Sequence, residues 1–290
     1  MRHVYECPVR WADLDMLNHV NNVTYVDYLQ EARVDMLRTH APDARAYDLA
    51  GGPSEGLVVV KHDITYLAPI PRRTEPIKIE CWITDLRAAS VTMAYEIFDD
   101  AGEHRVVHAR ASTVLTPFVF AEERPRRLTA DERDALSVFL EQAPAPATPR
   151  TEPRLLPEGH YPLQVRFSDV DVFGHVNNVK YFEYYQEARI PLMGHLSAGI
   201  PSAGVRVVVA HKQVDYLRPI FFRERPYDVW SWISHVGTRS VTIESQIRDS
   251  DTVFSRARVV LVFFDPDTQR SAAPSDLLLQ RLREFAAREL

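Results

Sequence analysis

The sequence has little of several features that mark large classes of protein. Only two of its 290 residues are cysteines, Cys7 and Cys81, which is too few for a disulfide framework and gives no Cys-x-x-Cys spacing for a metal or redox site. No run approaches the roughly 18 uninterrupted apolar residues of a membrane helix. The amino-terminal segment lacks the apolar region of a secretory signal. We therefore expect a cytoplasmic protein with no membrane span.

The sequence also has no excess of positive charge. The chain has 34 lysines and arginines against 40 aspartates and glutamates, for a formal net charge of -6. Such a chain is not drawn as a whole to nucleic acid, and we expect no nucleic-acid partner. The sequence also has no Gly-rich phosphate loop, no nicotinamide or flavin fingerprint and no cluster of metal ligands. We expect neither a metal nor a cofactor.

The sequence contains an internal repeat, in which one unit occurs twice. Val9–Asp15 is echoed by Val165–Asp171, and His19–Val23 is echoed by His175–Val179, with the same offset of 156 residues (165 − 9 and 175 − 19). A repeat of this length indicates a duplicated domain and not a solenoid.

Further along the chain the offset falls. Tyr66–Ile70 recurs as Tyr216–Ile220, an offset of 150 residues (216 − 66), so the second copy has lost residues in the loop after its helix. The segment Ala143–Pro149 is rich in proline and alanine, which favours an extended, semi-rigid spacer. We predict three parts: a domain at 1–142 with a C-terminal helix, a linker at 143–158, and a second domain at 159–290 with a C-terminal helix.

Each half has the same pattern of expected elements. A short strand leads into a polar loop, and a largely buried helix begins at an Asn pair, Asn21–Asn22 or Asn177–Asn178, whose amides are good N-caps. Runs rich in Val, Ile, Thr, Tyr and Trp then predict four strands, and a last helix follows. This order favours an α+β unit, a long antiparallel sheet wrapped around a helix. The strands are expected at 3–10, 57–66, 77–86, 90–98 and 106–116, then at 161–167, 205–216, 227–234, 240–247 and 257–264. The closing helices are expected at 130–142 and 276–289, with Thr129 and Ser275 as their N-caps.

The junction between the polar loop and the helix contains residues that are suited to catalysis. It combines a carboxylate, an imidazole and amides with a helix N-terminus, whose unpaired N–H groups can stabilise an oxyanion. The carboxylate could activate water or attack as a nucleophile. The candidate catalytic residues are Asp15, His19 and Asn22 in one half, and Asp171, His175 and Asn178 in the other. The candidate substrate-binding residues of the junction are Asn18, Tyr25, Gly174 and Tyr181.

Simpler roles stay open for these residues. An Asn before a helix often acts only as a cap, and we expect Asp13 and Asp169 to order the loop. A basic cluster follows the second repeated motif in each half, Arg72 and Arg73, then Arg223 and Arg225. Because the guanidinium fork suits phosphate, these arginines are candidates to bind the phosphates of CoA. The alternative is ordinary exposed charge in a turn.

The repeated motif resembles those of known hydrolases. An Asp-x-x-Gly-x-Val stretch with a Tyr ten residues after the Asp, as from Asp171 to Tyr181, resembles the 4-hydroxybenzoyl-CoA thioesterase group of hot-dog proteins. The stretch His-Val-Asn-Asn-x-x-Tyr is similar to bacterial long-chain acyl-CoA thioesterases and plant acyl-ACP thioesterases. The resemblance implies tandem hot-dog domains that form an intrachain pseudo-dimer. It also implies an acyl-CoA thioesterase of fatty-acid metabolism, with CoA as part of the substrate and Asp15 and Asp171 as the catalytic carboxylates.

The sequence departs from these families at several positions. The plant enzymes have an Asn where this chain has Leu17 and Phe173, some relatives have a His in place of Asn22 and Asn178, and Asn18 replaces the glycine in the first half. The identity of the residue that positions water therefore stays open. The question whether both halves are active also stays open.

Other functions also stay open. An acyl-ACP thioesterase would need a basic docking face for an acidic carrier, against a charge of -6. A hydratase is less favoured, because three residues separate Asp and His and no Asn-Pro is present. A binding module without catalysis has no need of the repeated carboxylate. We also expect the fused chain to form a homo-oligomer.

Overall fold

A computed structural model describes residues 1–40, 55–101, 104–143, 151–201, 204–268 and 270–288. The contacts within the chain divide it into two compact units, Met1–Ala147 and Thr148–Leu290. The duplication in the sequence therefore corresponds to two compact units, which repeat one architecture.

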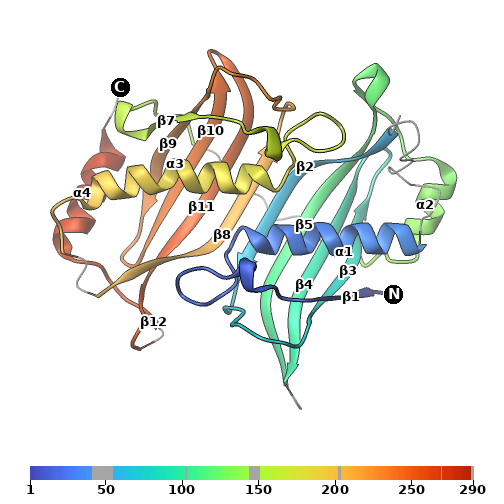
Figure 1. Ribbon diagram of the computed structural model, residues 1–290, viewed down its shortest axis with the longest axis horizontal. Coiled ribbons are helices and arrows are strands. Elements are labelled where there is room, and N and C mark those ends of the chain that lie inside the picture. Colours follow the sequence, from blue (N-terminus) through green and yellow to red (C-terminus); the bar gives the residue numbers. More distant parts are fainter. Residues whose placement is uncertain (41–54, 102–103, 144–150, 202–203, 269, 289–290) are drawn as a thin grey trace. The chain divides into compact units, whose positions relative to one another are not determined.

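The first unit is an antiparallel sheet with one long helix (Figure 1). Its strands run in the order β1-β3-β4-β5-β2, so the long strands form a meander while the amino-terminal strand joins the far edge at β3. The short strand β6 pairs with the end of β5. The elements are β1 His3–Cys7, α1 Thr24–His40, β2 Glu55–Tyr66, β3 Ile77–Leu86, β4 Val91–Ala101, β5 His104–Val119, β6 Arg124–Pro125 and α2 Ala130–Ser137.

The second unit repeats this topology. Its strands run in the order β8-β11-β10-β9-β7, again antiparallel, and β12 pairs with the end of β11. The elements are β7 His160–Leu163, α3 Lys180–Ser197, β8 Arg206–Tyr216, β9 Tyr227–Val236, β10 Ser240–Asp249, β11 Thr252–Asp265, β12 Arg270–Ser271 and α4 Asp276–Ala287. The α+β class and the strand pattern predicted from the sequence are confirmed in both units.

The long helix of each unit is largely buried, as expected from its wide apolar surface. In α1 the residues Tyr25, Leu29, Ala32 and Met36 are at most 3% exposed, and the same positions are buried in α3. Figure 1 shows each helix crossing the strands of its own sheet. Burial of a side chain of this size stabilises by about 1.5–3 kcal/mol, so packing against the sheet is what holds each helix in place.

The interior between helix and sheet also contains polar groups. Arg33 of α1 and Arg189 of α3 are both buried. Lys212 of β8 is fully buried, and its Nζ donates to the carbonyl oxygen of Phe182 at 2.7 Å. At the matching place in the first unit, His62 is buried and its Nδ1 lies 2.9 Å from the hydroxyl of Thr113. These buried polar groups beneath the helices were not expected from the sequence.

The helix starts differ from the prediction. Helix α1 begins at Thr24 and α3 at Lys180, two or three residues after the Asn pairs. Instead of capping, Asn21 accepts the N–H of Val23 with its side chain and the N–H of Thr24 with its carbonyl. This local turn competes with helix geometry, so the expected N-caps are corrected to a turn that precedes the helix. The N-cap of α3 is Val179, which makes no side-chain cap bond.

The closing helices follow their predicted caps. The Thr129 side chain accepts the N–H of Glu132, and the Glu132 carboxylate accepts the N–H of Thr129, which satisfies two donors at once. Ser275 caps α4 in the same way through Leu278. Helix α2 ends at Ser137, earlier than expected.

Part of the predicted linker belongs to the second unit. Residues 144–150 lie outside the described part of the chain. Thr151 bonds to the indole of Trp232 at 3.2 Å, and Leu156 lies in the hydrophobic core. Gly159 approaches the sheet so closely that an added Cβ would lie 2.0 Å from the carbonyl oxygen of Ser231. Because these contacts are tertiary, the proline and alanine content of the sequence did not reveal them.

Over the described ranges, no helix combines the length and apolar character that are needed to cross a membrane.

Candidate active site

The polar loop of each unit is anchored by an aspartate that faces the helix. Asp13 is 3% exposed, accepts the N–H of Arg10 at 2.8 Å and the hydroxyl of Tyr28 at 2.7 Å, and pairs with the Arg10 guanidinium. Asp169 accepts the hydroxyl of Tyr184 in the same way. These two aspartates order the loop, as expected, by tying it to the second turn of the helix.

The second pair of repeated carboxylates, Asp15 and Asp171, lies in the tight part of the loop. Asp171 accepts the N–H of Phe173 at 2.9 Å. Its own N–H donates to the carbonyl of His175, and its carbonyl accepts the N–H of Gly174. Gly174 has φ 78, in the left-handed region that suits glycine. The carboxylate is therefore held in one orientation by a short closed loop just before α3.

The electrostatics of Asp171 are set mainly by burial. Burial raises the pKa of this carboxyl above its ordinary value, while the Phe173 N–H and the nearby His175 act in the opposite direction. A carboxyl with a raised pKa can take up a proton more readily near neutral pH, which is the property of a general base.

The first unit builds the same loop from different residues. Asp15 accepts the N–H groups of Leu17 at 2.8 Å and His19 at 3.3 Å. The turn passes through Asn18, whose φ is 60; asparagine tolerates this conformation better than most residues. Replacement of the glycine by Asn18 therefore leaves the loop intact.

The second repeated motif holds this loop against the sheet. The backbone N–H of Val176 donates to the carbonyl of Ile220 at 2.9 Å, and the Tyr216 hydroxyl donates to the carbonyl of Asn178 at 2.8 Å. The N–H of Ile220 donates to the hydroxyl of Tyr181 at 3.2 Å. The first unit repeats these bonds through Ile70, Tyr66 and Tyr25. This motif is visible as a repeat in the sequence, but its contacts with the loop were not predicted.

The tyrosines proposed as substrate contacts lie in the core. Tyr25 and Tyr181 are each 3% exposed, and both hydroxyls accept a backbone N–H. Burial raises the pKa of both hydroxyls well above the ordinary value. The structure gives these side chains a role in fixing the loop.

The imidazole of His175 lies close enough to Asp171 to lower the pKa of that carboxyl. His175 is partly exposed, and its ring meets that of Phe221 edge to face at 5.0 Å. Asn22 and Asn178 are also partly exposed. Asn177 engages the N–H groups of Val179 and Lys180, so these two donors are already used.

The arginines of the basic clusters have partners within their own unit. Arg73 pairs with Asp99, and Arg223 pairs with Asp249. Arg225 lies 3.3 Å from the same carboxylate and is largely exposed, and Arg72 is exposed. The structure thus brings Arg223 and Arg225 together on one carboxylate. A phosphate at either cluster would compete with an existing ion pair.

Apolar side chains surround the second site. Phe167 is 83% exposed, Phe222 50% and Phe221 46%, and the rings of Phe167 and Phe222 meet edge to face at 6.1 Å. The residue of the first unit at the place of Phe222 is Arg72, so the two sites have different rims. Exposed apolar groups of this kind commonly mark a binding surface.

Comparison with known proteins identifies the repeat. A model of the Thioesterase-like superfamily matches residues 9–146 and 165–282, one match in each half. The structure of a putative oleoyl thioesterase from Lactobacillus plantarum is similar, with a TM-score of 0.68 and 16% identity over 90% of this chain and 96% of that chain. The 12:0-ACP thioesterase from Umbellularia californica gives a TM-score of 0.66 and 14% identity over 91% and 94% of the two chains. At these identities the likeness shows the fold: tandem hot-dog domains.

A sequence relative covers only part of the chain. YsmA of Bacillus subtilis, an uncharacterized protein, is 38% identical over 84 residues, which are 28% of this chain and 54% of YsmA. The match spans about half the length of that relative.

Proposed function

The chain belongs to the thioesterase-like superfamily, and from this premise we propose that it hydrolyses acyl-CoA thioesters to a free carboxylate and CoA. The observation that carries the proposal is the Asp171 carboxylate. It is held just before the N-terminus of α3 by the N–H of Phe173, and burial raises its pKa. A positioned carboxylate with a raised pKa, beside amide donors, is what attack on a thioester carbonyl requires.

The chemistry follows from these groups. Asp171 takes a proton from a water molecule, whose oxygen attacks the thioester carbonyl carbon. The resulting oxyanion is stabilised by N–H donors at the junction, among which we assign the amide of Asn178. The carbon–sulfur bond then breaks, and the thiolate of CoA receives the proton that Asp171 holds. In the alternative route the carboxylate itself attacks and forms a mixed anhydride, which water then hydrolyses. Each route uses the same residue.

The second half is proposed as the principal site. Its apolar rim of Phe167, Phe221 and Phe222 lies around the His175 side of the loop, where an acyl group could bury its chain at a gain of about 0.8 kcal/mol per CH₂. The first half retains the Asp15 loop but has the charged Arg72 at its rim. The equivalent carboxylates Asp15 and Asp171 thus have different surroundings. We therefore predict that the two halves differ in activity.

An acyl-ACP substrate is the competing possibility within the same chemistry. A carrier protein is acidic, and the chain carries a formal net charge of -6. Long-range repulsion would slow the encounter of two acidic proteins, so CoA esters are favoured.

The test is release of CoA thiol from acyl-CoAs of graded chain length. The wild type, Asp171→Asn, Asp15→Asn and the double variant are compared, and Asn is chosen because it keeps an oxygen acceptor for the loop N–H. We expect a loss of about 10²–10⁴-fold in Asp171→Asn and a smaller loss in Asp15→Asn.

The controls separate chemistry from folding. Asp169→Asn removes a loop-ordering carboxylate of the same half and should lower stability together with activity, whereas Asp171→Asn should lower activity alone. If acyl-CoA binds but no thiol is released by the wild type, the hydrolase proposal fails and a carrier-protein substrate or a binding module remains.

A further inference from the structure

Three large apolar side chains are exposed at equivalent positions of the two units. Each of the six is at least 46% exposed. The pairs are Trp11 and Phe167, Met16 and Val172, and Leu67 and Leu217. An exposed side chain adds little to a core, so packing within the unit does not explain why both copies have an apolar residue at each of these positions.

A tight turn at the start of the loop directs the aromatic ring outward. In the second unit the 3-10 turn Phe167–Asp169 carries Asp169 inward, where it accepts the Tyr184 hydroxyl at 2.7 Å. Successive side chains of such a turn point about 120° apart, so a turn whose third residue faces the helix presents its first residue to solvent. The first unit repeats this arrangement with Trp11 and Asp13.

In the second unit two more apolar residues join this surface. The N–H of Val176 donates to the carbonyl of Ile220 at 2.9 Å, which brings Phe221 and Phe222 beside the loop. The ring of Phe222 meets that of Phe167 edge to face at 6.1 Å. We call the five exposed apolar residues of this surface the apolar tip of the second unit: Phe167, Val172, Leu217, Phe221 and Phe222.

Exposed arginines lie next to the apolar tip in the sequence. Arg166 directly precedes Phe167, Arg218 directly follows Leu217, and both are exposed. Within the described residues neither arginine is part of an ion pair, and the same stretch contains one exposed carboxylate, Glu224. Protruding aromatic rings beside arginines are suited to the interface of an anionic bilayer, where the rings lie at the depth of the headgroups and the guanidinium groups bind lipid phosphates.

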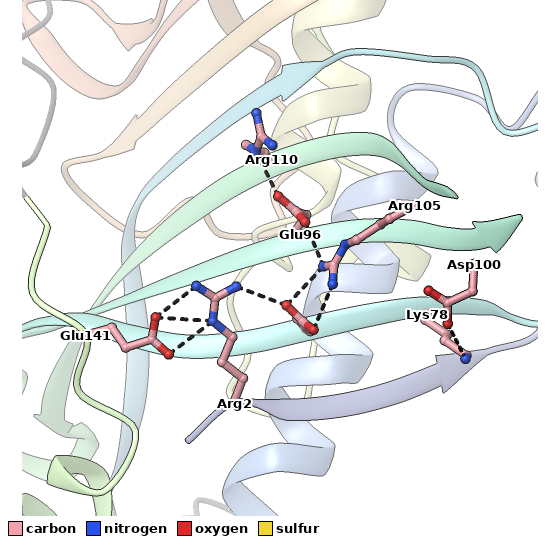
Figure 2. Close-up of polar contacts among 8 residues, drawn as sticks. Arg2, Lys78, Glu96, Asp100, Arg105, Arg110 and Glu141 are labelled. Atoms are coloured by element: carbon pink, nitrogen blue, oxygen red, sulfur yellow. Dashed lines mark hydrogen bonds and ion pairs between the residues drawn. The ribbon is translucent and has the colours of Figure 1, made fainter. Parts of the chain in front are cut away.

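The arginines of the first sheet, by contrast, are engaged by carboxylates. On β3, β4 and β5, Arg105 pairs with Glu80 at 2.9 Å and with Glu96 at 2.6 Å, and Arg110 pairs with Glu96 at 2.8 Å (Figure 2). Arg2 pairs with Glu80 at 3.0 Å. A lipid phosphate would have to displace a carboxylate from each of these guanidinium groups, so this ladder of ion pairs is a poor site for an anionic surface.

We propose that the apolar tip of the second unit, with Arg166 and Arg218, docks the protein on an anionic phospholipid bilayer. A bilayer fits better than a second copy of the chain, because these side chains project from two loops and a protein partner would need a matching hollow for each. Val172 directly follows Asp171, so docking places the loop that carries this carboxylate against the bilayer. The inference goes beyond the proposed hydrolysis and does not depend on it.

The test is cosedimentation of the full chain with large unilamellar vesicles, made of phosphatidylcholine alone or of a two-to-one mixture with phosphatidylglycerol. We expect binding to the mixed vesicles, about tenfold weaker binding to phosphatidylcholine, and weaker binding at high salt. Phe167→Ser should lower the partition coefficient about tenfold, since burial of a phenyl side chain contributes at least that factor. Arg166→Gln should lower it about fivefold. The matched control, Arg110→Gln, removes the same charge from the ladder and should leave binding unchanged.

A tryptophan reporter measures insertion of the apolar tip directly. Phe167→Trp in a Trp11→Phe background places the reporter in the tip, and lipids with brominated acyl chains quench the emission of a tryptophan that enters the bilayer. Trp11→Phe alone gives the background emission of the other tryptophans. We expect stronger quenching in the double variant than in this control, with mixed vesicles only.

Circular dichroism checks that each variant is folded. Absence of cosedimentation, equal binding to both kinds of vesicle, or quenching no greater than in the Trp11→Phe control would overturn the proposal. So would self-association of the chain in sedimentation equilibrium that Phe167→Ser abolishes, because the apolar tip would then be an interface between copies. The vesicles contain no thioester, so these results are independent of whether the chain hydrolyses acyl-CoA.

Discussion

The buried amine of Lys212 should make the stability of the protein depend on pH in an unusual direction. Lys212 is 0% exposed, and burial, followed by the like charge of Arg189, lowers its pKa well below the ordinary value. The amine therefore loses its proton at a lower pH in the folded chain than in the unfolded chain. Between these two pKa values the unfolded state binds more protons than the folded state, so the free energy of unfolding rises with pH.

The magnitude of this effect can be stated per pH unit. One proton corresponds to about 1.4 kcal/mol for each pH unit, so this group should raise the stability of the wild type by up to about 1.4 kcal/mol per pH unit between its folded and unfolded pKa values. Lys212→Met has a side chain of similar size but no titratable group. It loses the hydrogen bond to the Phe182 carbonyl, at a cost of about 1 kcal/mol at every pH. The advantage of the methionine variant over the wild type should be largest at pH 7 and should shrink toward pH 9.

The assay is urea denaturation of the full chain at pH 7, 8 and 9, with the lysine titration followed directly by the chemical shift of its labelled ε carbon. Lys180→Met is the control, because that lysine is partly exposed and pairs with Glu183 at the surface; its effect on stability should be small and independent of pH. A difference between Lys212→Met and the wild type that stays constant from pH 7 to pH 9 would refute the reasoning and would mean that the amine is charged inside the fold.

Four further predictions concern the second unit. Because burial raises the pKa of Asp171, the acid limb of kcat/KM should lie above the ordinary aspartate range, and the residual activity of Asp171→Asn should lack that limb in a pH–rate profile. Asn178→Leu should lower kcat by about 10²–10³ with little change in KM, and steady-state kinetics that show a change in KM alone would contradict the oxyanion role. Phe222→Arg should raise KM for long acyl-CoAs more than for short ones, which a chain-length series would measure. Gly159→Ala should strongly destabilise the second unit, since its Cβ would lie 2.0 Å from the carbonyl oxygen of Ser231; a thermal midpoint equal to that of the wild type would argue against this contact.

The architecture was predictable because local and global signals agree. The β-branched and aromatic runs form strands where expected, and the repeat assigns the same elements to both halves. The caps at Thr129 and Ser275 are local patterns, so they were found as well. The start of the long helix was misplaced because Asn21 and Asn177 are equally suited to a turn, and only the bonds to residues 23, 24, 179 and 180 decide between a turn and a cap.

The candidate site was predictable in part. The sequence predicts Asp15 and Asp171 in a polar loop before the long helix, and the structure places both in such a loop, nine residues before the helices begin at Thr24 and Lys180; their catalytic role stays a prediction. The role of the Tyr-Leu-x-Pro-Ile motif did not, because its tyrosine and isoleucine bond to a loop about 40 residues earlier, for example from Tyr216 to Asn178. Lys212 was also missed, since within an apolar strand pattern a lysine is ordinarily assigned to the exposed face, and its partner lies on a helix distant in sequence.

The segment from Thr148 to Gly159 contacts the second sheet. It therefore determines where the chain could be divided into two single domains. A gene fragment that starts at the first strand of the second half, at His160, would lack Thr151 and Gly159 and would expose the indole of Trp232 to water. One that starts at Thr148 would keep this segment and the Leu156 contribution to the core. The two halves are thus alike in the loops that carry Asp15 and Asp171, but the residues from Thr148 to Gly159 belong to the second unit. A single-domain version of the second half must include them.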